Sequence, residues 1–173
     1  GRVLACAKHY VGYGAAEGGR DYNTGEITDH TLRNIYLPPF KAAVQAGVGT
    51  VMAAFHDLNG EPASGSRYLL TDILKDEFGF TGFVISDWSS VGELVNHRVA
   101  ADEREAARMA FDAGLDMEMA TECYTHHLAE LVQAGAISAE RLDDAVRRVL
   151  AVKFRLGLFD RPYADTARQL EQL

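Results

Sequence analysis

Short apolar runs alternate along the chain with longer segments in which apolar residues recur at helical spacing. The apolar runs are Val3–Ala7, Val48–Ala54, Phe83–Ile85 and Leu115–Met119. The first three are largely apolar, which is typical of strands that are covered on both faces, and the fourth carries acids at alternate positions. We therefore predict four strands. Cys6, in the first of them, is expected to be a buried and reduced thiol.

Helical segments are predicted between these strands. Thr28 or Asp29 is expected to cap the first helix. Pro38 and Pro39 are then expected to interrupt that helix before it resumes at Phe40. Further helices are predicted over Arg67–Phe78, Asp102–Asp112, His127–Ala134 and Ser138–Leu156.

The alternation of one strand and one helix every roughly 30 to 45 residues indicates parallel βα units. Such units fit a doubly wound open sheet or part of an eight-stranded barrel, which needs about 250 residues. The loop Gly12–Gly19 follows a strand without the GxGxxG spacing, which disfavours a nucleotide-binding sheet. The predicted fold is α/β, a (β/α)8 TIM-type barrel of which residues 1–160 supply about four βα units, a half barrel. Residues 161–173 are predicted to form a peripheral tail or linker.

The composition excludes several classes of partner. A net charge of −8 over 173 residues argues against nucleic acid or an anionic membrane surface. No apolar run is long enough to span a bilayer. Cys6 and Cys123 lack the spacing of a metal site, and no metal or cofactor is predicted. Because a strand follows at once on Gly1, we expect a piece of a longer protein.

Asp87 follows the third strand and precedes Trp88, the single tryptophan of the chain. A carboxylate at the end of a buried strand can attack or stabilise a cationic carbon, and an indole can pack on the face of a sugar ring. The alternative is that Asp87 only caps a short helix that begins near Ser89. The segment therefore indicates either sugar chemistry or the start of a helix.

Polar or aromatic residues also follow the other predicted strands, at Lys8–His9, Met52–Phe55 and Asp116–Glu118. The carboxyl ends of the strands carry the chemistry in a TIM barrel, which makes these residues candidates for one site. Adjacent residues of a regular strand point to opposite faces, so Lys8 and His9 reach one ligand only if the backbone there is irregular. Asp116 and Glu118 are expected to be hydrogen-bonding groups of the barrel interior or strand mouth.

Each candidate also has a purely structural interpretation. Lys8 and His9 can form a solvated strand end, and Met52 can fill the core. Arg20, which closes the glycine-rich loop, can pair with acids of the same loop. His56 and His97 lie near strand ends and receive no role from the sequence.

Several segments together resemble glycoside hydrolase family 3, and most closely its β-glucosidases. In family order they read ACAKHYVGYGAAEGGRDYN, TLRNIYLPPFKAAVQAGVGTVMAAFHDLNG, LLTDILKDEFGFTGFVISDWSSV, AGLDMEM and AVRRVLAVKFRLGLF. The resemblance extends from Val3 to Tyr163. It implies a retaining exo-glycosidase in which Asp87 is the nucleophile and forms a covalent glycosyl intermediate. Such chemistry needs a protonated acid about 5 Å from the ionised nucleophile.

The resemblance also assigns substrate-binding roles. The residues matched to positions that bind sugar hydroxyls or line the same subsite are Lys8, His9, Arg20, Met52 and Trp88. These roles rest on the family pattern and not on the spacing of the residues.

Two departures from the family pattern bear on the mechanism. Phe55 stands where many members have tyrosine, which removes a hydroxyl near the nucleophile. No general acid is identifiable, since the β-glucosidases take a glutamate from a following domain, and Glu17 and Glu93 are weaker candidates within the chain. The loop GYGAAEGGRDY contains no histidine, which rejects the hexosaminidase branch with its Asp-Ser-His motif.

The matched segments correspond to the second half of the barrel. Half a barrel exposes sheet edges and apolar surface, so we expect a complementary half and a following domain, from the same protein or another copy, to pack on it. The leading hypothesis is a periplasmic or secreted enzyme that acts on β-glucosides or oligosaccharides. The alternatives are a non-catalytic half barrel that binds sugar or serves as an assembly subunit, and a βα enzyme for phosphorylated metabolites.

Overall fold

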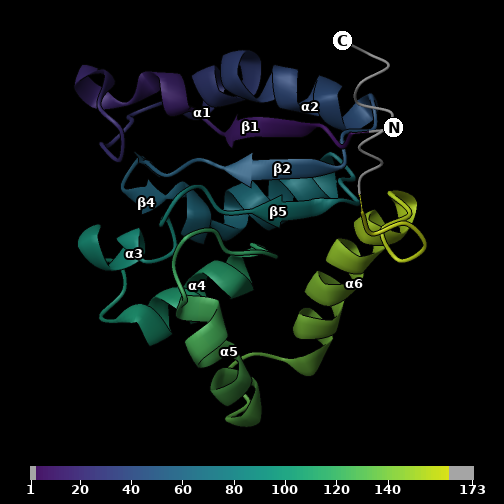
Figure 1. Cartoon of the computed structure of the whole chain (residues 1–173). Helices are drawn as coiled ribbons and strands as arrows, with labels where there is room; N and C mark the ends of the chain where they lie inside the picture. Colours follow the sequence, from purple (N-terminus) through teal and green to yellow (C-terminus); the bar gives the residue numbers. More distant parts are fainter. Residues whose placement is uncertain (1–2, 164–173) are drawn as a thin grey trace.

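The computed structural model describes residues 3–163 and contains a parallel three-stranded sheet (Figure 1). Its strands are β1 (Cys6–Tyr10), β2 (Thr50–Ala53) and β5 (Phe83–Ile85), in the spatial order β1-β2-β5. The connections between them are helical, and a small antiparallel hairpin of β3 (Asp57–Leu58) and β4 (Glu61–Pro62) follows β2. The predicted α/β class with parallel strands is confirmed.

The first strand begins later than predicted and includes Lys8 and His9. Cys6 is exposed, so the prediction of a buried thiol is wrong, and Cys123 is the buried cysteine. The reason is that β1 is the edge strand of the described sheet and has β2 as its single neighbour there.

The predicted fourth strand, Leu115–Met119, makes only one parallel bridge, between Ile85 and Met117. The N–H groups of Asp116 and Met117 both donate to the carbonyl of Val84, at 2.9 and 3.1 Å. Two consecutive donors on one acceptor break the regular ladder. The segment therefore follows β5 as an irregular chain.

The helix after β1 runs through both prolines without a break. It consists of α1 (Asp29–Thr31), η3 (Leu32–Tyr36) and α2 (Leu37–Gln45). The Leu37 N–H donates to the carbonyl of Leu32, five residues back, and this wider turn carries the helix into two residues that have no N–H to donate. The predicted interruption is therefore wrong, whereas the predicted cap is confirmed, since Thr28 Oγ1 accepts from the Thr31 N–H at 3.2 Å.

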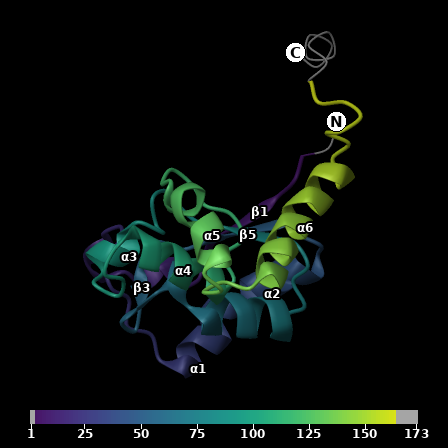
Figure 2. The same cartoon turned by 90° about the horizontal axis from the view of Figure 1, so that it is seen from below.

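The other helices agree with the predicted segments to within a few residues. They are η5 (Tyr68–Glu77), α3 (Glu93–Asn96), α4 (Glu103–Ala113), α5 (Cys123–Gln133) and α6 (Ala139–Arg155), with short turns η1 (Tyr13–Ala15), η2 (Glu17–Gly19) and η4 (Ala63–Gly65). Figure 2 shows α6 beside β5 and running away from α3 and α4. Of the predicted tail, residues 164–173 lie outside the described residues. Within residues 3–163, no helix combines the length and apolarity needed to cross a bilayer.

The two faces of the sheet differ in burial. Val51 and Val84 are paired in register and fully buried in a core that includes Leu70, Leu74 and Phe111. The residues of the opposite face are less covered: Met52, Phe83 and Ile85 are only partly buried. Since successive residues of a strand point to opposite faces, the helices bury one face and leave the other partly open.

A buried ion cluster connects β5 to two helices. Asp116 Oδ1 lies 2.8 Å from Lys75 Nζ of η5 and 2.9 Å from Arg141 Nη1 of α6. Asp116 Oδ2 accepts from the Val84 N–H at 2.9 Å. Burial lowers the pKa of Lys75 to about 8, against the opposing attraction of Asp116. Asp116 is thus a hydrogen-bonding group, as predicted, but it faces the helices and not the barrel interior.

Glu118 has a different task from Asp116. Its Oε2 accepts from the Tyr124 N–H at 2.8 Å, and its Oε1 accepts from the Cys123 N–H at 3.2 Å. These N–H groups belong to the first turn of α5, where the helix itself offers them no carbonyl acceptor. In a regular strand, Asp116 and Glu118 would point to the same face because they are two residues apart. The irregular backbone at Met117 explains why they instead have different partners.

We predict that Asp116→Asn destabilises the protein by about 3 kcal/mol or more, because it leaves two buried cations without their counter-charge. Denaturant unfolding of the full-length protein measures this change. Asp143→Asn, at an exposed carboxylate of the same α6, is the matched control and should leave the unfolding midpoint unchanged. Equal midpoints for both variants would refute the structural role of the cluster.

Candidate active site

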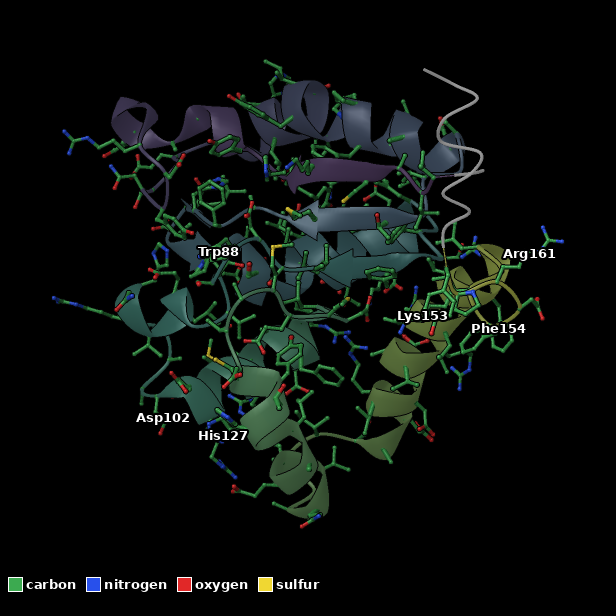
Figure 3. The ribbon with its side chains drawn as sticks, in the orientation of Figure 1. Trp88, Asp102, His127, Lys153, Phe154 and Arg161 are labelled. Carbon is green, nitrogen blue, oxygen red and sulfur yellow. The ribbon has the colours of Figure 1, made fainter. Side chains whose placement is uncertain are left out.

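The candidate site lies at the carboxyl ends of the three strands. Asp87 comes two residues after β5, Phe55 follows β2, and His9 lies near the end of β1. Figure 3 places Trp88 on the side of the molecule to which the strand arrows point, opposite Lys153 and Phe154. The strands therefore bring together residues that are more than thirty positions apart in the sequence.

The two oxygens of the Asp87 carboxylate have different environments. Oδ1 accepts from the Trp88 N–H at 2.6 Å. Oδ2 is buried and has no hydrogen-bond partner among the described residues, although His9 Nε2 lies 3.3 Å away. The α3 helix begins at Glu93 with Gly92 as its cap, so Asp87 does not cap it. One oxygen is therefore held by a hydrogen bond, and the other is buried without one.

His9 reaches Asp87 because β1 is irregular at its end. The pairing register of β1 with β2 shifts between Ala7 and Tyr10, and the Lys8–His9 and Tyr10–Val11 peptide bonds are cis. The predicted irregularity at Lys8–His9 is confirmed. The His9 side chain is 22% exposed and that of Asp87 is 14% exposed, so both remain accessible from solvent.

Aromatic rings form a wall beside the carboxylate. The ring of Phe55 lies 5.9 Å from that of His9, 5.0 Å from Tyr13 and 4.6 Å from Tyr22, between ring centroids. The Tyr13 hydroxyl donates to Asp21 Oδ1 at 2.8 Å, and this hydrogen bond is the main reason that the pKa of Tyr13 is raised. The Trp88 side chain is 65% exposed, which leaves its indole free to meet a ligand.

The remaining predicted site residues lie at different distances from this centre. Met52 is partly buried and pairs with Ile85, two residues before Asp87. Lys8 and Arg20 are both exposed, and no hydrogen bond or ion pair within residues 3–163 connects either of them to Asp87. Their substrate-binding roles stay predictions.

Two residues of the site were missed from the sequence. The Tyr22 hydroxyl donates to the Trp88 carbonyl at 2.8 Å. Tyr22 lies in a loop, where a single tyrosine belongs to no periodic pattern that would indicate a contact. The Ser86 hydroxyl donates to the Asp87 carbonyl at 2.9 Å and accepts from the Met119 N–H at 2.7 Å. The contacts of Tyr22 with Trp88 and of Ser86 with Met119 join segments that meet only in the folded chain, so no local signal reveals them.

His56 lies next to Phe55 and is completely buried, and neither ring nitrogen has a hydrogen-bond partner among the described residues. A Cβ at Gly12 would lie 3.6 Å from its Nε2, and one at Gly25 would lie 3.4 Å from its Cδ2. The imidazole thus packs against Gly12, at the start of the glycine-rich loop, and against Gly25, which follows that loop. Burial lowers the pKa of His56, Asp57 opposes that shift, and His97 adds to it.

We predict that His56 makes the protein less stable as the pH falls below about 6.5, the ordinary imidazole pKa. Below that pH the imidazole of the unfolded chain binds a proton while that of the folded chain stays neutral. The free energy of unfolding therefore decreases as the pH falls from 6.5 to the lower pKa of the folded state. In His56→Leu, the melting temperature between pH 7.5 and 5 should fall less steeply than in the wild type. His30→Leu, at an exposed imidazole, should keep the wild-type slope. The same slope in all three proteins would contradict this prediction.

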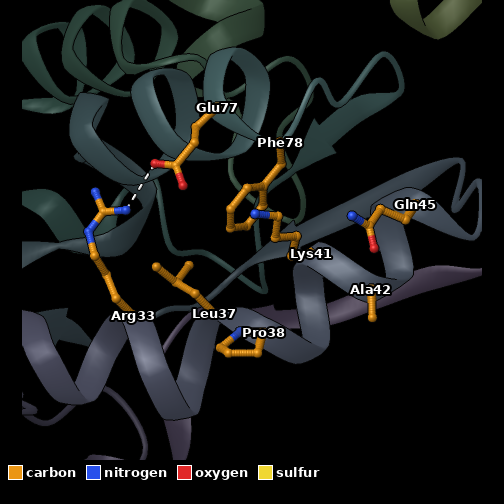
Figure 4. A pocket seen from close by; sticks show the side chains of 8 residues that line it. All are labelled: Arg33, Leu37, Pro38, Lys41, Ala42, Gln45, Glu77 and Phe78. Atoms are coloured by element: carbon orange, nitrogen blue, oxygen red, sulfur yellow. Dashed lines mark hydrogen bonds and ion pairs between the residues drawn. The ribbon is translucent and has the colours of Figure 1, made fainter.

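A cavity of about 290 Å³ lies between α2 and η5, with Arg33, Lys41 and Phe78 in its lining (Figure 4). Arg33 and Glu77 form an ion pair of 2.9 Å across it. In the described part of the chain, no three His, Cys, Asp or Glu side chains form a group that could hold a metal ion.

The chain belongs to glycosyl hydrolase family 3, because residues 1–152 match the model of the family's N-terminal domain. It is 46% identical over 162 residues to a periplasmic β-glucosidase of Salmonella typhimurium, covering 94% of this chain and 21% of the relative. It is 41% identical over 167 residues to a β-xylosidase of Formosa agariphila, covering 91% of this chain and 23% of the relative. The chain therefore spans about a fifth of the length of these relatives.

The fold agrees with solved structures of the same family. A β-glucosidase from Listeria innocua superimposes with a TM-score of 0.91 at 45% identity, over 94% of this chain and 22% of that one. A β-glucosidase from Erythrobacter marinus gives 0.91 at 40% identity, over 96% of this chain and 22% of that one. The predicted partial TIM-type barrel and the resemblance to family 3 are confirmed.

Proposed function

We propose that this chain supplies the nucleophile half of a retaining, exo-acting β-glucosidase. The observation that carries the proposal is the Asp87 carboxylate, which is held through one oxygen, has no hydrogen bond at the other and precedes an exposed tryptophan. The membership of family 3 supports it, as do relatives named β-glucosidase and a Listeria innocua structure in complex with glucose.

The reaction proceeds by two displacements. Asp87 Oδ2 attacks the anomeric carbon of a terminal β-linked glucose while a general acid protonates the departing glycosidic oxygen. The bond between that carbon and oxygen breaks, and a glycosyl–aspartate ester remains. Water, deprotonated by the same acid group in its conjugate form, then attacks the anomeric carbon and releases glucose and the free carboxylate.

The residues around Asp87 bind the terminal sugar in this proposal. Lys8, His9 and Arg20 donate hydrogen bonds to sugar hydroxyls, whose oxygen atoms can accept them. Met52 and Trp88 line the apolar face of the sugar ring. The exposed indole of Trp88 offers contact area to that face. Because several relatives are named β-xylosidases, the choice between glucose and xylose belongs to the same test.

The complete enzyme, in this proposal, includes parts beyond the described residues. The open face of the sheet and the exposed Val146, Leu150 and Phe154 of α6 leave apolar surface for a complementary barrel half and a following domain. The following domain supplies the general acid. A periplasmic or secreted location is proposed from the name of the Salmonella relative, and fractionation of producing cells tests it.

The alternative is a non-catalytic half barrel that binds sugar or assembles with other chains. Covalent trapping separates the two functions, because a binding module forms no ester with its ligand.

We predict that a 2-deoxy-2-fluoro-β-glucoside labels the full-length protein once, on the peptide that contains Asp87. Intact mass followed by peptide mapping measures this, and the matched fluoro-xyloside reports the sugar preference. Asp87→Asn should remain unlabelled and lose about 10⁴-fold or more in kcat. Binding of glucose without any label would leave the non-catalytic module as the function.

We also predict that no acid of this chain acts as the proton donor. Glu17→Gln and Glu93→Gln should each keep kcat within about threefold of the wild type, whereas loss of a general acid costs about 10²- to 10⁴-fold. A fall of that size in either variant, restored by adding azide as an external nucleophile, would place the acid within the described chain.

A further inference from the structure

Tyr22 connects the glycine-rich loop to the turn that carries Asp87. Its hydroxyl donates to the Trp88 carbonyl at 2.8 Å, across 66 positions of sequence. Its ring lies against Phe55, with centroids 4.6 Å apart and planes tilted by 38°. The backbone of Tyr22 has φ of +64°, a left-handed conformation that is uncommon for an aromatic residue. Contacts of the side chain therefore compensate for an unfavourable backbone.

The turn that Tyr22 contacts sets the direction of the Asp87 carboxylate. The Trp88 N–H donates to Asp87 Oδ1 at 2.6 Å, and the next residue, Ser89, has φ of +56° and donates its N–H to the Met119 carbonyl at 3.1 Å. Since Trp88 is 65% exposed, packing of its side chain does not hold the main chain of this turn. The hydrogen bonds on either side of Trp88 hold it instead.

We infer that Tyr22 is a positioning residue for the nucleophile: its hydroxyl holds the Trp88 main chain, whose N–H orients Asp87 for attack. This inference rests on the proposed role of Asp87. Burial, followed by the charges of Asp87 and Glu93, raises the pKa of Tyr22 and keeps the phenol a donor.

A positioning role differs from a merely structural one in what it changes. Loss of the hydroxyl alone leaves the stack on Phe55, so the loop stays in place and the affinity for the sugar changes little. The orientation of Asp87 relaxes, and a reacting group displaced by about 1 Å can lose about 100-fold in rate. The effect should therefore fall on the rate of ester formation and not on the folded fraction.

The test is trapping by a 2-deoxy-2-fluoro-β-glucoside in the full-length protein, followed in time by intact mass. In Tyr22→Phe, we expect one label per chain, formed about 10- to 100-fold more slowly at saturating reagent, with KM within about threefold of the wild type. Tyr68→Phe is the matched control, since its hydroxyl bonds to Asp29 on the surface away from Asp87. It should react at the wild-type rate.

A second variant separates the ring from the hydroxyl. Tyr22→Leu also removes the stack on Phe55, and we expect KM to rise in addition to the loss of rate. Labelling of Tyr22→Phe at the wild-type rate overturns the inference, and so does a reduced labelled fraction that still reacts at that rate. If the wild type itself takes no label, the role of Asp87 fails first and the inference falls with it.

Discussion

The buried carboxylate of Asp116 joins the strand that carries the site to the helices behind it. It balances Lys75 and Arg141 and accepts the main-chain N–H of Val84, three residues before Asp87. Each of the two cations would be costly to bury without this partner, and each also donates to backbone carbonyls, Lys75 to Gly114 and Arg141 to Phe111 and Leu115. β5 is therefore anchored at its middle residue, Val84, by a contact made on its helical side.

The residues that follow the carboxyl end of β5 have fewer stabilising contacts. Asp87 keeps one oxygen without a hydrogen bond, and Trp88 keeps most of its ring in solvent. An unpartnered buried oxygen weakens folding, and functional sites are where proteins retain such groups. The contacts of Asp116 thus hold β5 from the helical side, whereas at its carboxyl end Tyr22 donates to the Trp88 carbonyl beside Asp87.

The two faces of the sheet are covered to different extents by the described residues. Met52, Phe83 and Ile85 lie on that face with partial burial, whereas Val51 and Val84 on the helical face are fully covered. A parallel sheet normally has both faces covered. Within the described residues, the partly open face therefore leaves apolar side chains incompletely covered.

The sequence alone determined the family, the alternation of strands and helices, and the position of Asp87 at the end of a strand, because these follow from local patterns of apolar residues and motifs. Caps such as Thr28 were also readable locally. The tertiary structure decided what each polar group contacts: that Asp116 faces Lys75 and not the site, that His56 is buried without a partner, and that Tyr22 reaches Trp88. These outcomes depend on pairings between distant segments, and local sequence patterns do not encode such pairings.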